Sequence, residues 1–457
     1  MTHLSAFAGV SASALAEWRT ALGAAHVVAD GAALAAADRA CCGRRGGVAA
    51  VLYPADETQV RQCLAVARRR GARVHPVSTG RNWGYGSRQP PEARAAVMSL
   101  QRLNGIAGLD RVGARARLQP GVTFGALAAW LRREAPELLA PEIGAGPDAS
   151  VLGNALAGGL GKGPYGWMAR RLSDLKLAMP DGSIVRLENV ARSGLGEAAR
   201  GGVALEASFQ LCQAPVFRAL AWARLVDGAG ALASALELAL PLASERDRHE
   251  QVELLNGARL RLQSPGLAAG PGEGVHAGWL LALTLWGQDE AEIAWRLARA
   301  QRRLGRLPTV AVGAEAVERV ADLPAPDRQG LTSAYTLTGR PPPVDADPDR
   351  DGCGVRWISP LLPSSSAAAV AALDALGACA IAHGFPPALA VRLPDGDPVG
   401  LLGLFWNRNG PAAEVARSDA RAAACAAAFR SEAGRLGLVL YRRDAGEARA
   451  KTLVEAQ

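Results

Sequence analysis

Glycine-rich loops with a neighbouring arginine are the first residues of this chain whose spacing suggests chemistry. Residues 76–86 (PVSTGRNWGYG) follow a strand-like apolar run and contain three glycines and Arg81. Glycine adopts positive φ at little cost, so such a loop can turn several backbone N–H groups toward one anion. Arg81 adds the positive charge that a pyrophosphate would need. The loop has neither the GxGxxG that opens a helix in dinucleotide-binding folds nor the GK[ST] of a P-loop.

Further motifs follow the first loop in a fixed order. Residues 146–155 (GPDASVLGNA) contain Asp148, and residues 157–166 (AGGLGKGPYG) contain Tyr165. Near the C-terminus stand WISP, at residues 357–360, and the pair Tyr441–Arg442. A single glycine-rich turn is structural more often than functional, but these turns do not stand alone.

Short strands and capped helices are expected to position the loops. Asp56 begins a helix with Gln59 at the capping-box position, and Gly71 ends it; Thr123 caps a helix over 124–133. Short apolar runs predict strands at 47–53, 73–78, 95–100, 114–119, 207–212, 279–286, 353–363 and 400–407. A strand-turn-strand is expected at 176–187, a loop at 339–352, and helices at 220–240, 290–304, 366–384 and 411–436. A glycine-rich loop after the second strand is typical of an α+β nucleotide-binding unit.

Composition sets the broad class. The 457 residues are 49% hydrophobic and 21% charged, which indicates a soluble globular protein of two or three domains at roughly 150 residues each. No run of about 18 apolar residues predicts a membrane span, and no signal peptide is evident. Seven cysteines do not form a disulfide framework, so we expect a cytoplasmic protein. The net charge of +8 comes from scattered arginines, which argues against nucleic-acid binding and mildly favours an anionic ligand.

The order and content of these motifs resemble the FAD-linked oxidases of the vanillyl-alcohol oxidase and p-cresol methylhydroxylase (PCMH) family. The resemblance covers residues 45–190 well and 350–443 more loosely. It implies an α+β fold: a PCMH-type FAD-binding domain with an α+β cap domain built on an antiparallel sheet. The expected boundaries are 1–215 for the FAD domain, 216–424 for the cap, and 425–457 for a segment that returns to the FAD domain.

The resemblance also implies roles for individual residues. Tyr85, Tyr441 and Arg442 would hold a phenolate substrate, whose para carbon gives a hydride to flavin N5. Asp148 would lie near N5, with Tyr165 alongside. The alternatives are structural: Asp148 could equally cap a turn after Pro147, and Tyr85 could pack against the flavin without binding the substrate. FAD would be bound by Ser78, Thr79, Gly80, Arg81, Asn82, Trp83, Gly84, Gly86, Pro147, Ser150, Gly153, Asn154, Gly159 and Gly161.

Departures from the family pattern affect the cofactor. Asn82 stands where some relatives have a flavin-linking His, and no Cys lies between Cys63 and Cys212, so we expect noncovalent FAD. In the cap, Tyr335, His249 and His276 are more readily explained as structural than as flavin links. Residues 194–215 keep little of the segment that contacts the adenine end in relatives. A second hypothesis is therefore a degenerate family member that binds FAD weakly and acts as a binding or assembly partner.

Other partners and sites are expected as follows. The substrate would be a small organic molecule, a para-substituted phenol or a secondary-metabolite intermediate, with oxygen or an electron-acceptor protein taking the electrons. A homo-oligomer is a further expected partner state. No Cys/His spacing typical of a metal site is seen, so no metal is expected. His75 is expected at a strand edge or buried, and His383 at a helix C-terminus.

Overall fold

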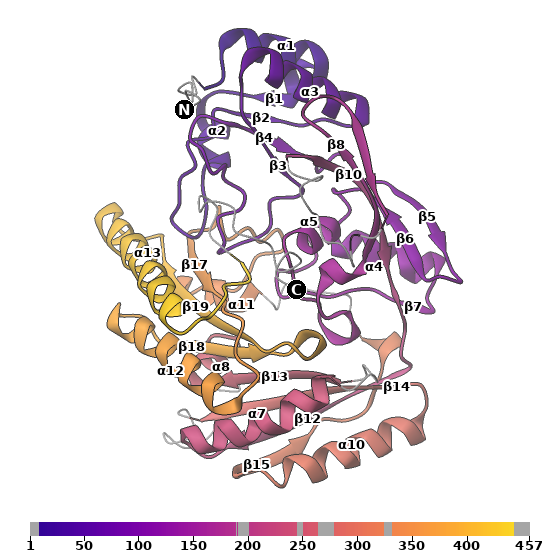
Figure 1. The fold of residues 1–457 in the computed structure, drawn as a ribbon, viewed down its shortest axis with the longest axis vertical. Coiled ribbons are helices and arrows are strands. Elements are labelled where there is room, and N and C mark those ends of the chain that lie inside the picture. The colour runs from indigo at the N-terminus through magenta and orange to yellow at the C-terminus, as the bar shows by residue number, and fades with distance from the viewer. Residues whose placement is uncertain are drawn as a thin grey trace.

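Two sheets from the first half of the chain face one large sheet from the second half across the middle of the molecule (Figure 1). The computed structural model describes residues 9–188, 190, 201–244, 250–263, 278–323 and 331–442. Strands and helices occur in both halves, as an α+β fold requires. The site lies where the sheets face each other, so we describe each sheet by what it contributes there.

The first sheet has four short strands in the order β1-β2-β4-β3. β4 pairs in parallel with both β2 and β3, and α3 connects β2 to β3. The predicted capping of α3 is confirmed: Asp56 accepts a hydrogen bond from the N–H of Gln59 at 2.8 Å, and Gly71 ends the helix with φ of 61°. The elements are β1 (Val27–Val28), α1 (Ala12–Leu22), α2 (Gly31–Ala37), β2 (Ala50–Leu52), α3 (Glu57–Arg70), β3 (Val74–Val77) and β4 (Ala96–Ser99).

The second sheet is antiparallel, with five strands in the order β5-β6-β10-β8-β9. The predicted strand-turn-strand appears as β8 and β9, and Thr123 caps α4 by accepting from the N–H of Ala126 at 3.1 Å. The elements are β5 (Ile106–Asp110), β6 (Arg115–Leu118), α4 (Phe124–Glu134), α5 (Val151–Leu156), β8 (Leu172–Ala178), β9 (Ile184–Leu187) and β10 (Val203–Gln210). A two-stranded pair, β7 (Leu138–Leu139) and β11 (Cys212–Gln213), lies beside it.

The large sheet is antiparallel and runs in the order β15-β12-β14-β13-β18-β19-β17, with β16 on β12. Figure 1 shows α7, α10, α12 and α13 on its outer side. Its strands are β12 (Phe217–Leu225), β13 (Glu250–Asn256), β14 (Trp279–Gly287), β15 (Thr309–Ala314), β16 (Glu318–Arg319), β17 (Cys353–Ile358), β18 (Ala388–Arg392) and β19 (Val399–Asn407). Its helices are α7 (Ala229–Ser244), α8 (Gly257–Gln263), α10 (Glu290–Leu304), α11 (Thr332–Tyr335), α12 (Ser366–Ala382) and α13 (Ala412–Arg435).

The helix predicted over 220–240 is wrong in its first part. Residues 217–225 form β12, whose side chains alternate between buried and half-buried, and only then does α7 begin. Alanine and leucine are strong helix formers, but the period of two in FRALAWARL lets one face pack under α7 and α10. Tertiary packing therefore overrides the local preference.

The C-terminal part of the chain reaches both halves of the molecule. α13 packs on the large sheet through Cys425 and Phe429, beside Leu376 of α12. After α13, the chain turns back, and the N–H of Tyr441 donates to the carbonyl oxygen of Ser359 at 3.1 Å. The domain boundary expected at 425 therefore falls inside a helix that belongs with the large sheet, and the boundaries stay a prediction.

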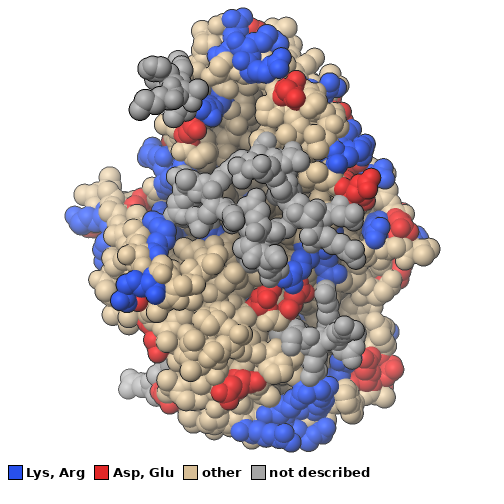
Figure 2. Space-filling view, in the orientation of Figure 1, with Lys and Arg blue, Asp and Glu red and all other residues tan. Residues whose placement is uncertain are grey.

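Charge and hydropathy on the surface follow the sequence pattern. Figure 2 shows Lys and Arg side chains interspersed with Asp and Glu over the visible face. Within the described ranges, no helix has both the length and the apolar character needed to cross a bilayer.

Candidate functional site

A cavity of about 620 Å³ opens between the two N-terminal sheets and the large sheet. The loop after β3 and the start of α5 line one part of it. Strands β13, β18 and β19 and helix α8 line the opposite part, and Tyr441 and Arg442 complete the wall. Segments that are hundreds of residues apart in the sequence thus line one cavity.

The loop after β3 is shaped for a phosphate-bearing ligand. Gly80 has φ of 71°, a conformation that favours glycine. Among described residues, none of the backbone N–H groups of Thr79, Gly80 and Arg81 donates a hydrogen bond to another part of the chain. Arg81 forms an ion pair with Asp347. The loop therefore offers backbone donors to the cavity next to a fixed guanidinium.

Close packing at Gly84 holds this loop against the large sheet. A Cβ atom at Gly84 would lie 2.4 Å from Cδ1 of Trp357, and Gly84 has φ of 84°. The N–H of Trp357 donates to the carbonyl oxygen of Gly84 at 3.3 Å. Glycine is required here for the approach of the indole ring rather than for contact with a ligand.

The start of α5 forms a second cradle. Ser150 accepts from the N–H of Gly153 at 2.8 Å and donates to the carbonyl oxygen of Pro120 at 2.6 Å. A Cβ at Gly153 would lie 2.7 Å from Oγ of Ser78, so this glycine lets α5 approach the first loop. Oδ1 of Asn154 is buried and has no hydrogen-bond partner among the described residues. A buried acceptor without a partner beside a cavity fits a bound polar cofactor such as FAD.

The structure brings most of the expected cofactor residues to the cavity. Those that line it are Ser78, Thr79, Gly80, Arg81, Asn82, Trp83, Ser150, Gly153 and Asn154. Those that do not line it are Gly84, Gly86, Pro147, Gly159 and Gly161. Gly159 has a packing role, since a Cβ there would lie 1.9 Å from Oδ1 of Asn154.

Tyr85, Tyr441 and Arg442 come together at one wall of the cavity, as expected. The hydroxyl oxygen of Tyr85 lies 3.4 Å from that of Tyr441 and 3.0 Å from Oγ of Ser359. Cζ of Arg442 lies 4.9 Å from the centre of the Tyr85 ring and 5.8 Å from that of Tyr441. Nη1 of Arg442 donates to Oδ1 of Asn82 at 2.7 Å. Two hydroxyl groups therefore lie next to each other, with a guanidinium beside both rings.

The electrostatics of this wall favour an anion. Burial raises the pKa of Tyr85 well above its usual value, although the nearby Arg442 acts in the opposite direction, so Tyr85 stays a hydrogen-bond donor at neutral pH. Trp167 packs edge-on against Tyr441, with ring centres 5.5 Å apart, and donates through Nε1 to Asp397 at 2.7 Å. These contacts hold the Tyr441 ring in place.

Two expected catalytic residues are not brought to the cavity. Tyr165 is 1% exposed, and its hydroxyl donates to the carbonyl oxygen of Leu139 and accepts from the N–H of Cys212 at 3.2 Å. Asp148 is half-buried and does not line the cavity, although its neighbour Ala149 does. Neither position contributes to the arrangement described above, and their catalytic roles stay predictions.

Several lining residues were not expected from the sequence. Glu253 of β13 and Arg392 of β18 form an ion pair at 2.9 Å, and Arg259 of α8 lies beside them in the wall. Burial opposes ionisation of Glu253, but the Arg392 guanidinium holds its pKa below the usual value. The alternation of β13 could have revealed Glu253, because Val252 and Leu254 are buried in the core and Glu253 must point the other way.

The histidines lie as follows. His75 is in β3, an edge strand of its sheet. Its Nε2 is 2.9 Å from the carbonyl oxygen of Ser87, and burial lowers the pKa of its imidazole. Tyr335 donates to Asp351 at 2.6 Å and does not line the cavity. His249 and His276 lie outside the described residues.

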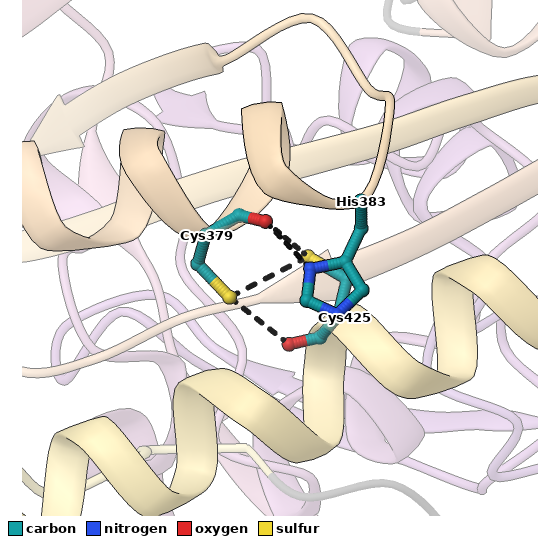
Figure 3. Close-up of side chains that lie close together, drawn as sticks. All are labelled: Cys379, His383 and Cys425. Atoms are coloured by element: carbon teal, nitrogen blue, oxygen red, sulfur yellow. Dashed lines mark hydrogen bonds between the residues drawn. The ribbon is translucent and has the colours of Figure 1, made fainter.

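The sequence shows no Cys/His spacing typical of a metal site, but the fold brings two cysteines and a histidine together in space. Figure 3 shows Cys379 and His383 of the α12 end beside Cys425 of α13, with side-chain ligand atoms within 4.8 Å of one another. The two sulfur atoms are 3.9 Å apart, and Nδ1 of His383 is 2.8 Å from the carbonyl oxygen of Cys379. His383 is the C-cap of α12, as expected. Helix packing joins residues 46 positions apart, which no local spacing reveals.

Comparison with known proteins agrees with this geometry. Residues 48–188 match the model of a family described as an FAD binding domain. A relative from Chondromyces crocatus, 1'-carboxy-chondrochloren decarboxylase, is 28% identical over 90% of this chain and 86% of its own length. The solved structures of p-cresol methylhydroxylase with substrate bound and of 4-ethylphenol oxidase from Gulosibacter chungangensis superpose with TM-scores of 0.77 and 0.78. These two are 17% and 18% identical, and each match covers 96% of this chain and 91% of the other.

The matched domain contains the first loop, the start of α5 and the orphaned Asn154, so the predicted fold class and cofactor are confirmed. The two solved structures share the fold over nearly the whole chain, including the strands of the large sheet. The chain therefore contains an FAD-binding domain at residues 48–188, and over nearly its whole length it has the fold of p-cresol methylhydroxylase and 4-ethylphenol oxidase.

Proposed function

We propose that this protein oxidises a para-substituted phenol by transferring a hydride from the carbon attached to the ring to N5 of bound FAD. The observation that carries the proposal is the cluster of Tyr85, Tyr441 and Arg442 at the cavity wall. Its two hydroxyl oxygens are 3.4 Å apart, and the guanidinium lies over both rings. This arrangement supports recognition of a phenolate oxygen.

The role of the cluster follows from acid–base chemistry. A phenol loses its proton most easily where hydrogen-bond donors and a positive charge surround its oxygen. Tyr85 is kept protonated by burial and can donate, while Arg442 supplies the charge. The electron pair of the phenolate then drives a hydride from the side-chain carbon and leaves a quinone methide. FAD, when bound, accepts that hydride and its two electrons.

The residues that hold FAD are proposed from the fit described above. The N–H groups of Thr79, Gly80 and Arg81 would bind the pyrophosphate, and Asn154 would meet a donor of the cofactor. The flavin would be held without a covalent bond, since Asn82 donates to Ser87 and accepts from Arg442.

Oxidative decarboxylation is a second candidate, favoured by the named activity of the relative that covers 90% of this chain. The first step is the same hydride transfer. If the next side-chain carbon carries a carboxylate, its bond to the carboxylate carbon breaks and CO₂ leaves. The electron pair of that bond forms the side-chain double bond and restores the phenolate. Product analysis distinguishes the two outcomes, because only this one releases CO₂.

The test is anaerobic mixing of the purified, FAD-loaded protein with 4-ethylphenol, followed by the flavin absorbance. We expect Tyr441→Phe to slow flavin reduction at least about tenfold, because a hydrogen bond to a charged oxygen contributes roughly 1.5–3 kcal/mol. Tyr53→Phe is the matched control, since Tyr53 is half-buried outside the cavity. Equal rates in Tyr441→Phe and the parent would refute the phenolate role. A protein that neither contains nor takes up FAD would instead support the degenerate binding partner.

A further inference from the structure

Arg259 is a buried charge that the phenol-binding cluster does not use. It lies in α8, is 7% exposed and lines the cavity. Its Cζ is 4.9 Å from the ring centre of Trp357 and 5.5 Å from that of Phe405. Nε and Nη1 have no hydrogen-bond partner in the part of the chain that the structure describes. An unpaired buried guanidinium is costly and therefore calls for an anionic partner.

The anionic partner of Arg259 would have to come from a ligand, because the acidic residues around the cavity already pair with other basic residues. Among the described lining residues, Glu253 is the one acid, and it pairs with Arg392. The other basic residues of the lining with an acidic partner are Arg81 with Asp347, Arg88 with Asp349 at 3.3 Å, and Lys162 with Glu142 at 3.8 Å. Arg259 and Arg442 form no direct ion pair with a carboxylate among the described residues, although the charge of Glu253 acts on Arg259 from nearby.

The two remaining guanidiniums lie on connected parts of the wall. The guanidinium of Arg259 lies over the ring of Trp357. Trp357 in turn packs against Gly84, the residue before Tyr85. Arg442 lies over the Tyr85 ring. Both guanidiniums therefore line the same cavity and contact neighbouring residues of its wall.

We propose that the substrate carries a carboxylate in addition to its phenol, and that Arg259 binds this carboxylate. The proposal rests on the proposed function, which assigns Arg442 to the phenolate. A guanidinium fixed between two aromatic rings presents a planar set of donors that matches a carboxylate. Burial lowers the pKa of Arg259 to about 10, which leaves it charged at neutral pH. The preferred ligand is thus a phenol with an anionic side chain, which should bind more tightly than a neutral phenol of the same shape.

The test compares 4-hydroxyphenoxyacetate with its neutral amide as ligands of the FAD-loaded protein. Both have oxygen at the para position, so neither can lose a hydride from that atom, and binding is followed by the flavin spectrum. We expect the acid to bind about 10- to 100-fold more tightly than the amide, as charge-assisted hydrogen bonds in a buried site predict. Arg259→Gln should abolish this preference while leaving the affinity for the amide within about threefold.

Arg261→Gln is the control, because Arg261 is exposed on the same helix. It should retain the preference. Equal binding of acid and amide to the parent protein would overturn the proposal, even if Arg259→Gln failed to fold. A preference that survives in Arg259→Gln would overturn it as well. The proposed function fails by a different measurement, the reduction of the flavin. If that function is wrong, phenols leave the flavin oxidised whichever side chain they carry.

Discussion

Removal of the Arg442 charge should change the pH at which the protein works. Arg442 is held by Asn82, and its Nε has no hydrogen-bond partner among the described residues. A guanidinium about 4 Å from a phenolate oxygen stabilises the anion by about 4 kcal/mol at an effective dielectric constant near 20. Because one pKa unit corresponds to about 1.4 kcal/mol, Arg442→Met should raise the pKa of the bound phenol by about two to three units.

The assay is the rate of anaerobic flavin reduction by 4-ethylphenol as a function of pH. A positive charge lowers the pKa of the bound phenol, so its loss should move the rising limb of the profile to higher pH. Arg442→Lys keeps the charge without the planar set of donors and should lie between the two. Arg435→Met is the control, since Arg435 is exposed and pairs with Glu432. The same midpoint in Arg442→Met and in the parent would refute the assigned role.

Three further predictions test the site and its support. Gly84→Ala should lower stability by about 1–3 kcal/mol and weaken FAD retention, because its Cβ would lie 2.4 Å from Trp357; Gly108→Ala, in open space, should cost little in thermal unfolding. Acid precipitation should release FAD into the supernatant; flavin that stays with the protein would contradict noncovalent binding. Glu253→Gln should cost about 3–5 kcal/mol in denaturant unfolding at pH 7, because it leaves Arg392 unpaired. Since the pKa of Glu253 is lowered, its stabilisation is present above its ordinary pKa and is lost as pH falls through the folded value, so an unchanged difference in acid would refute it.

Local signals in the sequence predicted those parts of the fold that local chemistry determines. The Asp56 cap and the left-handed Gly71 define α3 without help from the rest of the chain. Local signals gave the wrong element type for β12, because its alanines and leucines favour a helix. The strand forms instead because its neighbours in the sheet and two helices pack against it. Sequence preference therefore predicts ends of elements better than it predicts their type in apolar runs.

Some residues of the candidate site were predicted from the sequence and others were missed. Tyr85 and Arg442 were linked through family resemblance, since no local pattern relates residues that lie 356 and more positions apart. Arg259 was missed because arginines are frequent throughout this sequence, so their identity alone carries little information. Burial distinguishes it: the exposed Arg261 two residues later shares its helix but not its surroundings.

The contact between Asn82 and Arg442 has a consequence for biosynthesis. The two residues are 360 positions apart, so at about 5–20 residues per second the ribosome needs about 20–70 s to make the second after the first. Residues 1–210, which supply both N-terminal sheets including β10, are made well before that time. Their glycine-rich cradle is then exposed to free FAD on the side that the large sheet and residues 441–442 later cover. Cofactor capture during synthesis would thus precede completion of the substrate end.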